Sequence, residues 1–196
     1  MQTPEHLVLA MAKNGDVDAF NRLVAVYQDS VYGFSLSLTR HSAIADDVTQ
    51  ETFISAFRSI SKMRGSNVKA WLLRIARNKA YDHFRRQNRR RELSVDDEDS
   101  TFRERLPSDN PSPADMAINS ELREALEHCV GALSHAHREL IVLIDVQGQS
   151  YDDAAEVCGA NIGTVKSRLN RARHQVRDCL RSFPGLLSDR LATRVS

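Results

Sequence analysis

The chain has 196 residues, which is enough for one or two domains with buried cores. Hydrophobic residues make up 41% of it and charged residues 27%, values typical of a soluble globular protein. No window approaches the ~20 apolar residues of a membrane span, and the N-terminus lacks the basic start and apolar core of a signal peptide. We therefore expect a cytoplasmic protein with no membrane insertion of its own.

The net charge of +1 hides a strong segregation of charge along the chain. Positive residues concentrate in 74–91 and 166–181, and negative residues concentrate in 96–115. Because the local potential rather than the total charge attracts a polyanion, both basic segments are candidates for nucleic-acid binding.

Apolar residues repeat at helical spacing through the first sixty positions, which predicts helices over 3–13, from Asp16 to about 40, and from Ser42 onward. In the third helix the spacing predicts that the buried side is formed by Thr49, Phe53, Ala56, Phe57 and Ile60. The opposite arc is polar and contains Asp47, Gln50, Glu51, Ile54 and Arg58. This arc fits either a solvated face or a surface that docks a basic partner helix around an apolar spot.

A loop with Gly65 and Ser66 precedes a basic helix over 68–91, for which Asn67 is the expected cap. The predicted packing side of this helix contains Trp71, Leu72, Ile75 and Ala76. Another side carries Arg74, Arg77, Asn78, Tyr81 and Arg85. Arginines interleaved with an aromatic residue suit phosphate neutralisation together with base stacking.

Residues 92–113 have no apolar period and are rich in Asp, Glu, Ser and Pro, which predicts a flexible acidic linker and the clearest domain boundary. The linker could occupy a basic channel or act as a solvated tether. Beyond it, the pattern predicts a helix ending near Gly131 and a second helix that Ser134 caps. Leu140, Ile141, Leu143 and Ile144 are the expected core of this second domain.

The stretch 150–180 has the pattern of two helices around a tight turn. Ser150 and Asp153 form a capping-box start, Gly159 ends the first helix, and Asn161 can cap the second. The second helix gathers its apolar side from Ile162, Val165, Leu169, Ala172, Val176 and Leu180. Its opposite side and shoulders carry Gly163, Lys166, Ser167, Arg168, Asn170, Arg171, Arg173 and His174. A short helix, a glycine turn and a long basic helix are typical of a DNA-reading helix-turn-helix, although a plain helical hairpin with a solvated basic side fits as well.

Cysteines and histidines give no metal-site signal. Cys129, Cys158 and Cys179 are far apart, odd in number and without a CxxC spacing, so we expect small core or surface residues. The histidines at 128, 135 and 137 lack a ligand spacing with an acidic partner. We expect no metal and no cofactor.

Three segments in order resemble the extracytoplasmic-function (ECF) class of bacterial sigma factors: DDVTQETFISAFR at 46–58, AWLLRIARNKAYDHFRR at 70–86, and residues 133–177. With the helical patterns, the resemblance implies an all-α fold of two small helical domains joined by a flexible acidic linker. The expected divisions are an N-terminal region 2-like bundle at 1–91, the linker at 92–113, a region 4-like helix-turn-helix domain at 114–182, and a tail at 183–196.

The resemblance implies a non-enzymatic role in promoter-specific transcription initiation with core RNA polymerase, under control of an anti-sigma factor. The implied contacts to the polymerase clamp helices are Asp46, Asp47, Gln50, Glu51, Ile54 and Arg58. The implied contacts to the promoter −10 element are Arg64, Ser66, Asn67, Arg74, Arg77, Asn78, Tyr81, Arg85 and Arg86. The implied contacts to the −35 element are Thr164, Lys166, Ser167, Arg168, Asn170, Arg171 and His174. The linker would thread towards the RNA exit channel.

Two other classes of function compete with this interpretation. A dimeric helix-turn-helix regulator would explain 150–180 but would leave the basic helix at 68–91 and the acidic arc without a use. A decoy that titrates an anti-sigma factor usually carries a receiver domain, and no α/β pattern is present. An enzyme is least favoured, because the sequence has no phosphate loop, metal cluster or nucleophile elbow.

Overall fold

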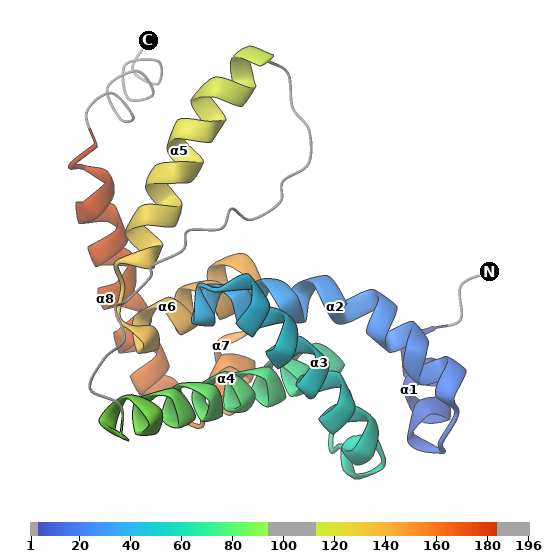
Figure 1. The fold of residues 1–196 in the computed structure, drawn as a ribbon. Coiled ribbons are helices and arrows are strands. Elements are labelled where there is room, and N and C mark those ends of the chain that lie inside the picture. The colour runs from blue at the N-terminus through green and yellow to red at the C-terminus, as the bar shows by residue number, and fades with distance from the viewer. Residues whose placement is uncertain (1–3, 94–112, 184–196) are drawn as a thin grey trace. The chain divides into compact units, whose positions relative to one another are not determined.

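A computed structural model describes residues 4–93 and 113–183 of the chain. Every regular element within these residues is a helix, which confirms the all-α prediction (Figure 1). The chain divides into two compact units. The first contains the N-terminal helices together with residues 152–160, and the second contains the remaining C-terminal helices.

The first unit is built on three long helices that pack against one another (Figure 1). Its elements are α1 (Glu5–Lys13), α2 (Val17–Thr39), α3 (Ser42–Ser59), the 3₁₀ turn η1 (Ile60–Lys62) and α4 (Val68–Leu93). The expected cap is present, because the Ala19 N–H donates to Asp16 Oδ1 at 3.0 Å. At the other end of α2, Arg40 takes the left-handed conformation with φ 56°, and its N–H closes the helix on the Leu36 carbonyl. This reversal lets α3 return along α2.

Small residues at the crossings let α2, α3 and α4 approach closely. Ala45, Ala56, Ala76 and Ala80 are fully buried. Larger buried side chains from all three helices fill the space between them: Leu23, Val31, Phe34, Leu38, Val48, Leu72 and Leu73. Burial of this apolar surface is what holds the unit together.

The predicted orientation of α3 is wrong by part of a turn. Phe57, expected in the core, is 47% exposed, and its ring lies edge-on to Phe20 with centroids 5.1 Å apart. Thr52 is buried instead, and its hydroxyl donates a hydrogen bond to the Val48 carbonyl at 2.7 Å. The small stripe around Ala45 and Ala56 fits the neighbouring helices more closely than a stripe containing Phe57 would.

The second unit contains α5 (Pro113–Gly131), α6 (His135–Ile141), the π-helical turn η2 (Val142–Val146) and α8 (Ile162–Leu180). Ser134 is the N-cap residue of α6, as predicted, although its side chain makes no capping hydrogen bond. The buried Arg138 organises this corner by donating to the carbonyls of Val130, Gly131 and Leu133 at 2.7–3.2 Å. These are carbonyls at and just beyond the end of α5, where the intrahelical hydrogen-bond pattern stops, and the Val130 carbonyl also accepts from the Leu133 N–H at 3.2 Å.

α7 (Tyr151–Cys158) and α8 are joined by the expected tight turn. Gly159 has φ 62°, a conformation that favours glycine, and Asn161 Oδ1 accepts from the Thr164 N–H at 2.8 Å. Both features confirm the sequence prediction. Residues 152–160 group with the first unit.

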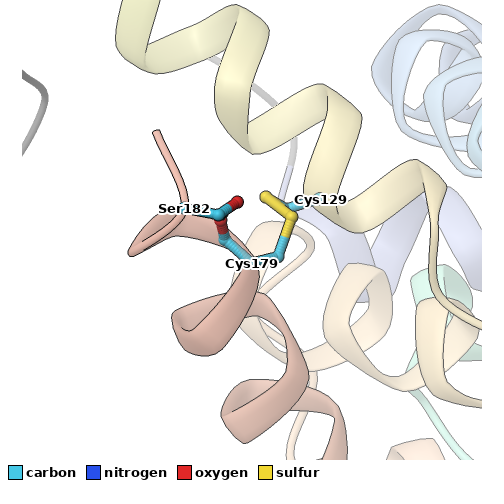
Figure 2. The surroundings of a disulfide bond; sticks show 3 residues. All are labelled: Cys129, Cys179 and Ser182. Atoms are coloured by element: carbon cyan, nitrogen blue, oxygen red, sulfur yellow. A yellow bond between two sulfur atoms is a disulfide. The ribbon is translucent and has the colours of Figure 1, made fainter. Parts of the chain in front are cut away.

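Two of the cysteines are not the isolated residues that the sequence suggested. Cys129 of α5 and Cys179 of α8 form a disulfide, with Cα atoms 5.7 Å apart (Figure 2). The two residues are 50 positions apart in the sequence, so no local spacing pattern predicts that they pair. Cys158 lies outside the disulfide.

The expected linker overlaps the undescribed residues 94–112, and its ends belong to helices: α4 continues to Leu93, and α5 begins at Pro113. All but the first residue of the expected tail also lies outside the described residues. Within the described ranges, no helix has both the length and the apolar character needed to cross a bilayer.

Candidate nucleic-acid interface

The first half of α8 exposes a polar face above a buried apolar stripe. Val165, Leu169 and Ala172 are buried at 0–1% exposure, which fixes the rotation of the helix. Thr164 is half-buried at the first turn. The other residues predicted for −35 recognition are all exposed: Lys166, Ser167, Arg168, Asn170, Arg171 and His174. One helix face therefore gathers the predicted set.

The long side chains of this face are available to a ligand. Within the residues that the structure describes, Arg168 and Arg171 take part in no ion pair, and both are exposed. The Ser167 hydroxyl donates to the Thr164 carbonyl at 3.1 Å, which leaves its oxygen able to accept. Arginines with unengaged guanidinium groups can pair bidentately with guanine O6 and N7 in a major groove.

A basic cavity of about 460 Å³ opens beside this face. Its lining residues are Tyr151, Lys166, Leu169, Asn170, Arg173, His174 and Arg177. Lys166 Nζ lies 5.9 Å from the centre of the Tyr151 ring, within the range of a cation–π contact. Three guanidinium and ammonium groups around one opening suit a phosphate oxygen.

Asp145 pairs with one of the lining residues, Arg173, and no sequence pattern points to it. Its carboxylate pairs with both Nε and Nη2 of Arg173, the Nε contact being 3.1 Å. This hydrogen-bonded pairing raises the pKa of Arg173 above its ordinary value. Asp145 lies 28 positions before Arg173 and within the π-helical turn η2, so the pair depends on the packing of η2 against α8.

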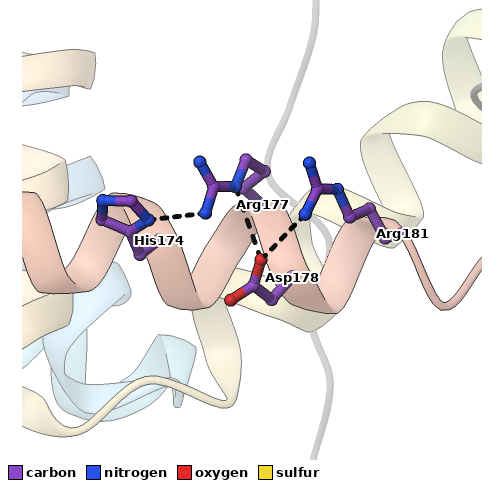
Figure 3. Close-up of polar contacts among 4 residues, drawn as sticks. All are labelled: His174, Arg177, Asp178 and Arg181. Atoms are coloured by element: carbon purple, nitrogen blue, oxygen red, sulfur yellow. Dashed lines mark hydrogen bonds and ion pairs between the residues drawn. The ribbon is translucent and has the colours of Figure 1, made fainter.

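A row of charged side chains continues along the later turns of α8 (Figure 3). Arg177 Nη2 lies 2.6 Å from His174 Nδ1, and because a guanidinium only donates, Nδ1 is the acceptor. Asp178 Oδ1 lies 3.4 Å from Arg177 and 3.5 Å from Arg181, at the limit of useful contact. Arg177 therefore contacts both His174 and Asp178 along this row.

α4 presents a second basic surface, in the first unit, with an aromatic component. Arg77 stacks its guanidinium carbon 4.6 Å from the centre of the Tyr81 ring, and Tyr81 meets Phe84 edge-on. Arg74, Arg77 and Tyr81 are half-buried. Exposed members of the predicted set continue the surface: Asn78, Arg85 and Arg86. Positive charge beside ring faces suits an unpaired nucleic-acid strand.

The loop before α4 contributes its polar residues. Arg64 and Ser66 are exposed on either side of Gly65, which has φ 78°. Asn67 is exposed as well, and its Oδ1 accepts from the Ala70 N–H at 3.0 Å, which confirms it as the cap. Asn67 thus has a structural role in addition to the nucleic-acid role predicted for it.

The predicted acidic arc of α3 is a continuous exposed face. Ile54, at its centre, is 52% exposed, and Glu51 is paired with Lys79 of α4 at 3.4 Å. All of the predicted residues on this face are exposed: Asp46, Asp47, Gln50, Glu51, Ile54 and Arg58. Phe57, seven residues after Gln50 and 47% exposed, lies at the edge of this face, so the error in the predicted orientation of α3 left out an apolar residue beside it.

Comparisons with known proteins assign the chain to a family. The model of Sigma-70 region 2 matches residues 23–90, and the model of Sigma-70 region 4 matches residues 123–176. A curated relative, the ECF RNA polymerase sigma factor EcfG of Rhodopseudomonas palustris, is 38% identical over 75% of this chain and 77% of its own length. The chain belongs to the ECF family of RNA polymerase sigma factors.

Other relatives agree with this membership. The ECF sigma-E factor of Haemophilus influenzae is 34% identical over 89% of this sigma factor and 94% of its own length. The ECF sigma factor SigE of Mycolicibacterium smegmatis is 35% identical over 83% of this chain, and the match spans 62% of that relative.

Two solved structures share the fold. The sigma factor RpoE, in complex with the anti-sigma factor NepR from Bartonella quintana, matches with a TM-score of 0.69 and 31% identity, over 85% of this chain and 99% of that one. CnrH, in complex with the cytosolic domain of CnrY, matches with a TM-score of 0.63 and 27% identity, over 90% and 97% of the two chains. The region 2 match contains the α3 and α4 faces, and the region 4 match contains the exposed face of α8.

Proposed function

We propose that this ECF sigma factor binds core RNA polymerase and directs it to promoters by reading the −35 duplex with α8 and capturing −10 DNA with α4. The observation that carries the proposal is the first half of α8. Its exposed polar face stands above a buried stripe, after a turn capped by Asn161. A helix held in this way can lay its N-terminal half in a major groove.

At the −35 element, the proposed base-reading residues are those of the exposed α8 face. Arg168 and Arg171 would pair with guanine, and each good bidentate contact is worth about 1–3 kcal/mol of discrimination. Lys166 and His174 border the basic cavity and would contact phosphate, which fixes the register of the helix on the duplex.

At the −10 element, the proposed surface is the basic face of α4 with the loop at 64–67. The Arg77–Tyr81 pair offers a cation beside a ring face, which supports stacking of an unpaired base. Taking a base out of the duplex costs a few kcal/mol. Binding of the −35 duplex and of the single strand would together offset that cost.

The exposed face of α3 is the proposed contact with the polymerase clamp helices. Its carboxylates would steer encounter with a basic partner, and Ile54, which is 52% exposed, would supply an apolar contact. Catalysis of RNA synthesis would belong to the polymerase, so the sigma factor itself is proposed not to be an enzyme. The proposal places it in the cytoplasm, where the polymerase works.

The proposed organisation is a polymerase- and −10-binding domain at 1–91, an acidic linker at 92–113, a −35-binding domain at 114–182, and a tail. Control by an anti-sigma factor is also proposed. One similar solved structure is a sigma factor, RpoE, in complex with the anti-sigma factor NepR, and another is CnrH in complex with the cytosolic domain of CnrY.

Run-off transcription tests the central proposal. Purified core RNA polymerase is supplied with genomic promoter fragments, with and without the protein. We expect promoter-specific transcripts only when the protein is present, and their start sites would identify the −35 and −10 sequences. A footprint by the protein alone, with no transcripts, would favour the dimeric regulator instead.

A matched pair of variants tests the polymerase contact. Ile54→Glu should remove most transcription, because it places a charge at the apolar centre of the α3 face. Val26→Glu changes another exposed apolar residue, on α2, which is 66% exposed against 52% for Ile54, and should leave transcription nearly unchanged. Equal loss in both would argue against a dedicated α3 contact.

A further inference from the structure

The disulfide joins the last turn of α8 to α5 (Figure 2) and borders a cavity of about 430 Å³ in the second unit. The cavity is lined by Cys129, Ala132, Leu133, Ser134, His137, Gln175 and Cys179. His137 Nδ1 lies 2.9 Å from Gln175 Oε1, so polar groups of α6 and α8 meet at its rim. A small polar molecule entering this cavity reaches the sulfur pair.

The two cysteines of the pair differ in exposure. Cys129 is 1% exposed, whereas Cys179 is half-buried in the final turn of α8. α8 ends at Leu180, one residue after Cys179, and the Ser182 hydroxyl donates a hydrogen bond to the Cys179 carbonyl at 2.6 Å. An incoming thiolate must touch the sulfur that it attacks, so access favours attack at Cys179.

The bond is also unusual for the compartment in which the protein is proposed to act. In a reducing cytoplasm, protein disulfides are mostly transient and either catalytic or redox-sensing. That this disulfide meets a reducing cytoplasm rests on the proposed function. Cys179 lies beyond the residues matched by the region 4 model, 123–176, so the family match gives no account of the pair.

We propose that Cys129 and Cys179 form a reversible thiol–disulfide exchange site for low-molecular-weight thiols, in which Cys179 is the attacked sulfur and Cys129 is the resolving thiol. The site takes a small thiol such as glutathione in its reduced form, and the corresponding disulfide in the reverse direction.

The exchange balances in two steps. A thiolate attacks Cys179 Sγ and forms a mixed disulfide, while the bond to Cys129 breaks and its electron pair leaves on Cys129, which takes a proton from water. A second thiolate then attacks the sulfur of the bound small thiol and releases Cys179. Overall, two small thiols are oxidised to one disulfide, and the protein disulfide gains two electrons and two protons.

The consequence for the fold is local. The buried residues that hold α8 to the unit, Val165 and Leu169, lie well before Cys179, and the buried Leu140 of α6 and Leu143 of η2 belong to elements that carry neither cysteine. Oxidation fixes the end of α8 to α5, and reduction releases that last turn while the rest of the unit stays folded.

The site is tested on the full-length protein with single-cysteine changes and glutathione disulfide as the probe. In Cys129→Ala, we expect rapid formation of one mixed disulfide at Cys179, located by peptide mass spectrometry. In Cys179→Ser, the adduct at Cys129 should form at least tenfold more slowly, because that sulfur is buried. Cys158→Ser should retain the internal disulfide and serves as the matched control.

Acid-quenched samples of the wild-type protein, taken during reduction with glutathione, should contain the mixed disulfide at Cys179 rather than at Cys129. Adducts forming equally at both positions, or only at Cys129, would overturn the proposed order of attack. An internal disulfide that never forms in glutathione buffers would overturn the site altogether. These readouts need no polymerase or promoter, so they stand apart from a failure of the proposed function.

Hydrogen exchange distinguishes a disulfide whose reduction releases only the last turn of α8 from one that the whole second unit needs in order to stay folded. On reduction we expect at least tenfold faster exchange of amides in the last turn of α8, near Arg181, with little change around Leu169. Circular dichroism should lose little helix signal. Unfolding of the whole second unit on reduction would identify the bond as structural and would contradict reversible exchange.

Discussion

Two basic helices, α4 in the first unit and α8 in the second, carry similar charge but present it differently. Arg74 and Arg77 of α4 are half-buried, and Arg77 is engaged with the ring of Tyr81. Arg168 and Arg171, in the first half of α8, are exposed beside a stripe in which Val165 and Leu169 are buried. Composition alone would treat the two helices alike.

The difference concerns what each helix can bind. A helix that is buried along only one narrow stripe can enter a major groove, because no neighbouring helix covers its other sides. A face with half-buried arginines and rings offers flat surfaces at which single bases can stack. The number of packed sides, rather than the number of arginines, separates a duplex-reading helix from one suited to an unpaired strand.

The largest expected effect comes from removing a core residue from each unit. Leu169→Ala and Leu73→Ala each remove a side chain that is at most 1% exposed, which should cost about 2–5 kcal/mol of unfolding free energy. Leu169→Ala should abolish −35 duplex binding and spare binding to core polymerase, and Leu73→Ala should do the reverse. Denaturation curves and the two binding assays check this, and loss of both activities in both variants would break the comparison.

A smaller effect is expected at single base pairs. Arg171→Ala should cost about 1–3 kcal/mol of discrimination at one −35 position, measured with a panel of duplexes that differ at single positions. Arg181→Ala, at the far end of α8, removes the same charge and is the control. If both variants weaken all duplexes equally, Arg171 contacts phosphate rather than a base.

The caps of the two helices allow a matched test. Asn67→Ala and Asn161→Ala each remove a cap acceptor and should cost about 1 kcal/mol of stability. Asn67→Ala should additionally weaken capture of −10 single strands, since Asn67 is also a predicted DNA contact. Thermal unfolding and single-strand binding separate the two roles. A stability loss without any change in strand binding would assign Asn67 to capping alone.

The smallest effect is expected from an exposed arginine at the end of the α4 surface. Arg85→Ala should weaken single-strand binding evenly across sequences and lower the slope against log salt by about 0.7. Its ion pair with Asp82, 3.2 Å long, joins two exposed side chains and should add little stability. Arg58→Ala, on the polymerase face of α3, should leave that slope unchanged. Binding titrations at several salt concentrations measure both.

Much of the fold could be predicted because its signals are local. The caps at Asp16, Asn67 and Asn161 each bond to an N–H three residues later, so a short window of sequence contains both partners. The turn at Gly159 needs a left-handed residue, which glycine supplies at no steric cost. The exposed faces of α3 and α8 follow from the helical repeat for the same reason.

The sequence by itself therefore determined the helices, their caps, and the polar faces that carry the candidate site. Tertiary structure decided which neighbouring stripe of α3 is buried, where a close fit of Ala45 and Ala56 excludes Phe57. It also decided the pairs that span long separations: Asp145 with Arg173 across 28 positions, and Cys129 with Cys179 across 50. Such pairs form only when packing brings distant turns together, and helical periodicity contains no information about distances between helices.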